Sequence, residues 1–121
     1  MNKTEIDIYG KIPPQSPEIE EAILGALIAE PDSYFQIQGI IKPEHFYKPE
    51  HQTIFSTIAE MHQKGKAIEL VTLVQTMKEK NTLDNIGGPA RLSYLVNRAS
   101  GYKVEHYAKV IADNYSRRSA I

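Results

Sequence analysis

Apolar residues recur every three or four positions along this chain, and this spacing constrains its fold more than any other feature. The first predicted helix begins at the N-cap Ser16, has Pro17 in its first turn, and carries an apolar stripe from Ile19 to Ile28. Serine at the N-cap and proline at the first helical position both favour a helix start. So wide a stripe predicts neighbours on more than one side of this helix. Strand-like alternation does not persist anywhere, so the sequence predicts an all-α fold.

Proline and glycine predict the limits of the later helices. We expect a second helix to start at Pro31, a third at Pro49, a fourth within residues 68–80, a fifth at Pro89 and a sixth near Lys103. Phe35, Ile37, Ile40 and Ile41 should supply the apolar contacts of the second helix, and Gly65 and Gly101 should end the third and fifth. The expected organisation is a flexible N-terminal arm (1–12), a compact head of about six helices (13–102) and a last helix (103–121).

Charge and composition narrow the class of function. The chain has 121 residues, enough for one domain, with 14 basic and 15 acidic side chains and a net charge of −1. A domain that binds nucleic acid through phosphate contacts usually has a strong basic excess, which is absent here. The chain has no cysteine, which excludes disulfides and thiolate metal sites and is compatible with a reducing cytoplasm. No apolar run approaches the roughly 20 residues of a membrane span.

Two histidines raise the question of a metal or acid–base site. His45 precedes the third predicted helix, and His51 lies on its apolar stripe with Ile54 and Phe55. Two histidines six residues apart across a proline have no established ligand geometry, and neither a third ligand nor a nucleophile is evident. We interpret His51 as a core residue that hydrogen-bonds a neighbouring turn. A small hydrolase that uses His45 and His51 is the competing hypothesis.

Other polar and glycine positions have structural interpretations. Gly25 costs about 1 kcal/mol in the middle of a helix relative to alanine, which favours a close helix–helix contact over a merely tolerated loss. We expect the carboxylate pairs Glu20/Glu21 and Glu44/Glu50 to face solvent. The adjacent Arg117 and Arg118 are expected to solvate the last helix or to interact with its dipole.

The motifs of several enzyme classes are absent from the sequence. It contains no P-loop, no HExxH zinc motif and no GxSxG nucleophile motif, and the GGP at residues 87–89 is too short to indicate phosphate binding. Composition and spacing therefore predict a small helical interaction module.

Five segments together resemble a known family. PPQSPEIEEAILGALI, HFYKPEHQTIFSTI, GKAIELVTLVQTM, LDNIGGPARLSYLVN and VEHYAKVIADNYSRRSAI occur in this order. From about Ile12 to the end, they resemble the N-terminal domain of the DnaB-type replicative DNA helicase. The resemblance implies a helical head that leads into the first arm of a helical hairpin, in a cytoplasmic hexamer whose N-terminal tier is a trimer of dimers.

The same resemblance implies partners and cofactors outside these residues. ATP, Mg²⁺ and most DNA contacts would belong to a RecA-like C-terminal domain, while primase and the helicase loader would be protein partners. No catalytic, cofactor or metal residue is implied in this chain. Structural roles are expected for Phe46, Tyr47, His51, Phe55, Gly87 and Gly88. Val110 and Ile121 lie outside the apolar stripe of the last helix, which fits a surface covered by a subunit or partner. A stand-alone helical adaptor, with no role in replication, is the alternative.

Overall fold

The computed structural model describes residues 15–99 and 103–120, and every regular element within them is helical. The α-helices are α1 (Pro17–Ala29), α2 (Tyr34–Ile37), α3 (Pro49–Gln63), α4 (Leu70–Glu79), α5 (Gly88–Val96) and α6 (Val104–Ser119). Short 3₁₀ segments, η2 (Pro31–Ser33), η3 (Pro43–His45) and η4 (Asp84–Ile86), connect them. The predicted all-α class and the expected number of about six helices are confirmed.

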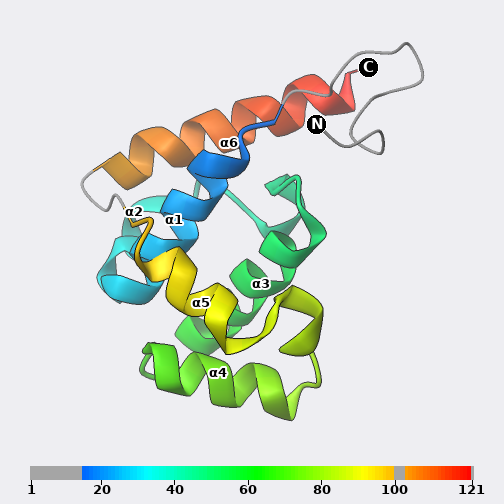
Figure 1. Ribbon diagram of the computed structural model, residues 1–121. Coiled ribbons are helices and arrows are strands. Elements are labelled where there is room, and N and C mark those ends of the chain that lie inside the picture. Colours follow the sequence, from blue (N-terminus) through cyan, green and yellow to red (C-terminus); the bar gives the residue numbers. More distant parts are fainter. Residues whose placement is uncertain (1–14, 100–102, 121) are drawn as a thin grey trace.

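Helix α1 forms the centre of the fold. It contacts α3, α5 and α6, and all its residues from 22 to 28 are buried. In Figure 1, α6 runs across one end of the molecule directly beside α1, and α4 forms the opposite end. The wide apolar stripe of the first helix therefore has neighbours on several sides, as the sequence predicted.

The contact between α1 and α5 is unusually close at Gly25. A Cβ added to Gly25 would overlap the carbonyl oxygen of Leu95 and lie 2.9 Å from its carbonyl carbon. Because a backbone oxygen cannot move away as a flexible side chain can, only glycine fits without displacing one of the two helices.

Helices α3 and α4 follow local sequence rules at their ends. Lys48 and Pro49 start α3, and Gly65 follows its end with a φ of 66°. Helix α4 buries only one face, through Leu73 and Met77, and Val71 is 73% exposed on another face. Gly87 and Gly88 connect η4 to α5. Their φ values of 104° and 74° are left-handed, a conformation that glycine adopts without strain.

Helix α6 packs on the head along most of its length. Val104, Ala108 and Ile111 are buried, and further along the helix the side-chain amide of Asn114 donates a 3.0 Å hydrogen bond to Ser16 Oγ. The hydroxyl of the N-cap Ser16 thus binds α6 and does not cap α1. The last helix is held against the start of the first.

Four predictions, on Phe35, Gly101, the N-terminal arm and Ile121, need correction or lie outside the described residues. Phe35 is 62% exposed because α2 is only four residues long and directs Ile37, not Phe35, into the core. Helix α5 ends at Val96, where Asn97 and Arg98 form a turn that closes on Ser93 and Leu95; Gly101 lies beyond the described residues. The predicted arm (1–12) and Ile121 also lie outside them. Among the described residues, no helix has both the length and the apolar character needed to cross a membrane.

Candidate functional site

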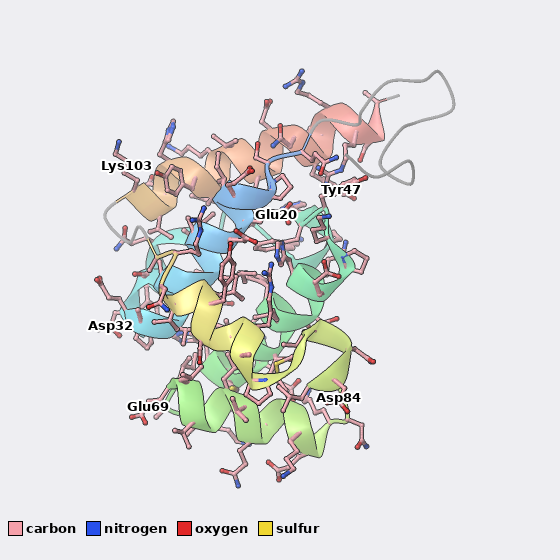
Figure 2. The ribbon with its side chains drawn as sticks, in the orientation of Figure 1. Glu20, Asp32, Tyr47, Glu69, Asp84 and Lys103 are labelled. Carbon is pink, nitrogen blue, oxygen red and sulfur yellow. The ribbon has the colours of Figure 1, made fainter. Side chains whose placement is uncertain are left out.

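A buried hydrogen bond between two side chains joins α1 to α3. Glu20 Oε1 lies 2.7 Å from His51 Nδ1, and the two side chains are 2% and 1% exposed. The same carboxylate accepts backbone hydrogen bonds from Tyr47 (2.7 Å) and Lys48 (3.4 Å) in the turn before α3. Figure 2 shows Glu20 on α1 near the start of α3, with Tyr47 in the turn below the end of α6. One carboxylate therefore organises the turn, the start of α3 and His51.

The second nitrogen of His51 faces α5. Arg91 Nη2 lies 3.4 Å from His51 Nε2. A guanidinium can only donate, so this contact requires an unprotonated Nε2 and places the ring proton on Nδ1, where it is donated to Glu20. His51 therefore connects α1 and α5 through its two ring nitrogens.

Arg91 continues this polar network to the surface. Its Nη2 donates a 2.8 Å hydrogen bond to Glu21, whose carboxylate also lies 3.7 Å from Arg98 Nε and 3.4 Å from the Tyr94 hydroxyl. The guanidinium carbons of Arg91 and Arg98 lie 4.9 Å and 5.9 Å from the centroid of the Tyr94 ring. Tyr94 is 43% exposed, so the network ends in an aromatic and cationic patch on α5 and the turn that follows it.

A second cluster joins the end of α6 to the turn at residues 43–47. Arg118 Nη2 donates a 3.0 Å hydrogen bond to the carbonyl oxygen of His45 and lies over the Tyr47 ring, 5.2 Å from its centroid. Burial lowers the pKa of the Arg118 guanidinium, which nevertheless stays charged at neutral pH. The His45 ring lies 4.7 Å from that of Tyr115, and its Nδ1 accepts a 3.0 Å hydrogen bond from the backbone N–H of Lys42.

The chemistry available to these groups is limited by their surroundings. His51 Nε2, the atom that would exchange a proton with a substrate, faces Arg91 in the interior. In the described part of the chain, no group of three or more histidine, aspartate or glutamate side chains is placed to hold a metal ion. This arrangement is better suited to holding α1, α3 and α5 in fixed relative positions than to acid–base or metal chemistry.

The structure gathers four of the sequence-selected residues at one place. Phe46 is fully buried, with its ring 5.0 Å from that of Phe55 and 6.5 Å from that of His51, and Tyr47 follows it in the turn. Gly25, Gly87 and Gly88 lie elsewhere, at the α1–α5 contact and the η4–α5 connection. Val110 is half-buried on α6.

Two predictions about charged residues are wrong. Glu20 is buried and Glu21 is 13% exposed, although both were expected to face solvent. The spacing contained a signal for Glu20, since it lies four and eight residues before the buried Leu24 and Ile28. Arg118 bonds a backbone carbonyl across the fold instead of only solvating its helix. No local pattern indicated that contact, which joins positions 73 residues apart.

Comparison with known families gives a match over most of the chain. Residues 12–113 match the family described as the DnaB-like helicase N terminal domain. The chain is 36% identical over 110 residues to the replicative DNA helicase DnaB of Rhodothermus marinus, covering 90% of this chain and 12% of the relative. It is 34% identical over 112 residues to that of Geobacillus stearothermophilus, covering 92% of this chain and 25% of the relative.

Solved structures agree with this match. The crystal structure of the N-terminal domain of DnaB helicase from Mycobacterium tuberculosis superimposes with a TM-score of 0.86 at 25% identity, covering 89% of this chain and 79% of that one. A DnaB-like replicative helicase, whose structure was described with its interactions with primase, superimposes with a TM-score of 0.77 at 23% identity. It covers 87% of this chain and 25% of that one, and at this identity the likeness shows the fold alone.

Proposed function

Because the chain belongs to the family of DnaB-like helicase N-terminal domains, we propose that it is the assembly and primase-docking domain of a hexameric replicative DNA helicase. The match over residues 12–113 is the observation that carries this proposal. The domain contributes to DNA replication by joining subunits and receiving partners, and the fragment itself is not catalytic.

The geometry of the site supports a role in protein contacts. Its charged groups are used within the fold, where Glu20 and His51 pair in the interior and Glu21 binds Arg91. Val110 on α6 is half-buried and available for a subunit or partner contact. Such a domain offers a rigid helical surface to other proteins.

ATP hydrolysis and most DNA binding by the whole helicase would be carried out by residues other than those of this chain. The chain spans 12% and 25% of the length of the two relatives above. ATP and Mg²⁺ would be bound, and most DNA contacts made, by a RecA-like domain in the rest of such a protein. The helicase loader would act on the assembled ring in the cytoplasm. Helix α6 would be the first arm of the hairpin through which subunits pair.

Two measurements on the purified chain test the proposal. In sedimentation velocity, the chain mixed with primase from the same organism should form a faster-sedimenting complex, and a thermally unfolded sample should not. In a coupled ATPase assay with single-stranded DNA, the chain should show no turnover above buffer. Sustained ATP hydrolysis that co-purifies with the chain, or separate sedimentation of primase at high concentrations of both proteins, would refute the respective part of the assignment.

A further inference from the structure

The end of α6 is held against the head by contacts other than apolar core packing. Val104, Ala108 and Ile111 bury the first half of the helix, and after Ile111 only the partly buried Ala112 packs an apolar side chain against the core of the described chain. Beyond that point, the contacts are the hydrogen bond from Asn114 to Ser16 and the cluster around Arg118. The position of the last turns therefore depends on polar and cation–π contacts.

Arg118 makes the most connected of these contacts. Its guanidinium bonds the His45 carbonyl at 3.0 Å and lies 5.2 Å and 5.8 Å from the ring centroids of Tyr47 and Tyr115. A planar guanidinium can bond an oxygen in its plane while its face lies on an aromatic ring, which a lysine ammonium cannot reproduce. The side chain is thus held from η3, from the turn and from its own helix.

The turn that receives Arg118 is itself held by the core. The backbone N–H of Tyr47 donates to the buried carboxylate of Glu20, which also binds His51. The Phe46 side chain beside it is fully buried. The end of α6 therefore rests on a point whose position is set by α1 and α3 and not on a free surface loop.

We propose that Arg118 is a positioning residue that fixes the direction in which α6 leaves the head. The inference rests on the proposed function in one respect, since the biological use of this direction depends on α6 being the first arm of a hairpin that pairs with a neighbouring subunit. The arm then presents its pairing face at an angle set within each subunit before assembly. Arg117, adjacent but exposed, has no such role.

Distances within the chain test this proposal directly. The chain has no cysteine, so spin labels at Ser56→Cys on α3 and Ser116→Cys on α6, both exposed, can be placed without background. Pulsed electron paramagnetic resonance should give one narrow distance distribution for this pair. Arg118→Ala should give a broader distribution with a shifted centre, and Arg117→Ala, which removes the same charge one residue earlier, should not.

A second label pair separates a loose helix end from a loose helix. The pair Ser56→Cys and Lys109→Cys reports the half of α6 fixed by buried residues, and its distance should be unchanged by Arg118→Ala. Arg118→Lys keeps the positive charge but loses the planar guanidinium, so it should also broaden the Ser56–Ser116 distance distribution. If circular dichroism shows that Arg118→Ala does not fold, the Arg118→Lys variant tests the proposal in its place.

Two outcomes would overturn the proposal. One is an unchanged Ser56–Ser116 distribution in a folded Arg118 variant, and the other is equal broadening by Arg117→Ala and Arg118→Ala. Because the measurement uses the chain alone, its failure leaves primase binding and subunit assembly untouched. Conversely, a failure of primase binding would leave the distances as evidence for the role of Arg118.

Discussion

Glu20 and His51 form a hydrogen-bonded pair in the core, with 2.7 Å between Oε1 and Nδ1 and side chains 2% and 1% exposed. The pair joins α1 to α3 through two residues that lie 31 positions apart in the sequence. Removing the charge of a carboxylate from water is costly, so Glu20 is stable in the core only when further hydrogen bonds compensate its burial. Here the backbone N–H groups of Tyr47 and Lys48 supply them.

Replacing Glu20 with alanine should be among the most destabilising substitutions in the chain. It leaves the His51 Nδ1–H and two backbone N–H groups without their acceptor, and each buried donor left unpaired costs about 1–3 kcal/mol. Urea denaturation followed by circular dichroism gives the free energy of unfolding. Glu18→Ala on the exposed side of the same helix is the matched control and should change it little. Equal effects of the two substitutions would show that Glu20 does not organise the turn.

Removal of the histidine should cost less than removal of the glutamate. His51→Ala leaves the Glu20 carboxylate with its backbone donors, so we expect a loss of about 1–3 kcal/mol from one unmade hydrogen bond and lost packing. The same urea titration measures it, and His62→Ala, in a partly exposed position on α3, serves as the comparison. A folded His51→Ala protein with unchanged stability but a lost hydrolytic activity would instead support the enzyme hypothesis.

Alanine at position 25 should destabilise the contact between α1 and α5. Its Cβ would meet the backbone of Leu95, and overpacking of this kind costs about 1–3 kcal/mol, which outweighs the better helix propensity of alanine. Gly39→Ala is the matched control because no atom lies within 4 Å of an added Cβ there. Thermal melts should show a lower Tm for Gly25→Ala only, and a higher one would mean that α5 moves aside at no cost.

Local rules explain why much of the fold could be predicted from the sequence. The start of α1 at Pro17, the start of α3 at Pro49 and the left-handed Gly65 each depend on residues within one helical turn. The core faces of α1 and α6 follow from the apolar spacing. The family resemblance likewise rests on the order of short segments along the chain.

Contacts between distant residues explain what could not be predicted. Glu20 binds the turn before α3, and Arg118 binds His45, only because the fold brings these segments together. A charged residue usually faces solvent, and only the spacing of Glu20 relative to Leu24 indicated that Glu20 is buried. Phe35 shows the converse, since the sequence favoured burial and a helix of four residues left it exposed.

His45, which contacts α6 through its carbonyl oxygen and its ring, makes the stability of the fold depend on pH. Burial is the largest influence and lowers the pKa of His45 below its usual 6.5; the charges of Lys42 and Arg118 lower it further, and Glu44 opposes them. Protonation is therefore harder in the folded state than in the unfolded state. The unprotonated Nδ1 also accepts the Lys42 N–H, which a protonated ring could not do.

Replacing His45 with asparagine should make the stability less dependent on pH. A lowered folded-state pKa contributes stability that is complete above pH 6.5 and is lost as the pH falls through the folded-state value. Between about pH 7.5 and 5.5, the Tm of the wild-type chain should therefore fall more than that of His45→Asn, whose amide oxygen can replace Nδ1 as acceptor. Comparing slopes removes the contribution of the other histidines, which both proteins share. Parallel curves from calorimetry would show that His45 is no more difficult to protonate in the fold than in the open chain.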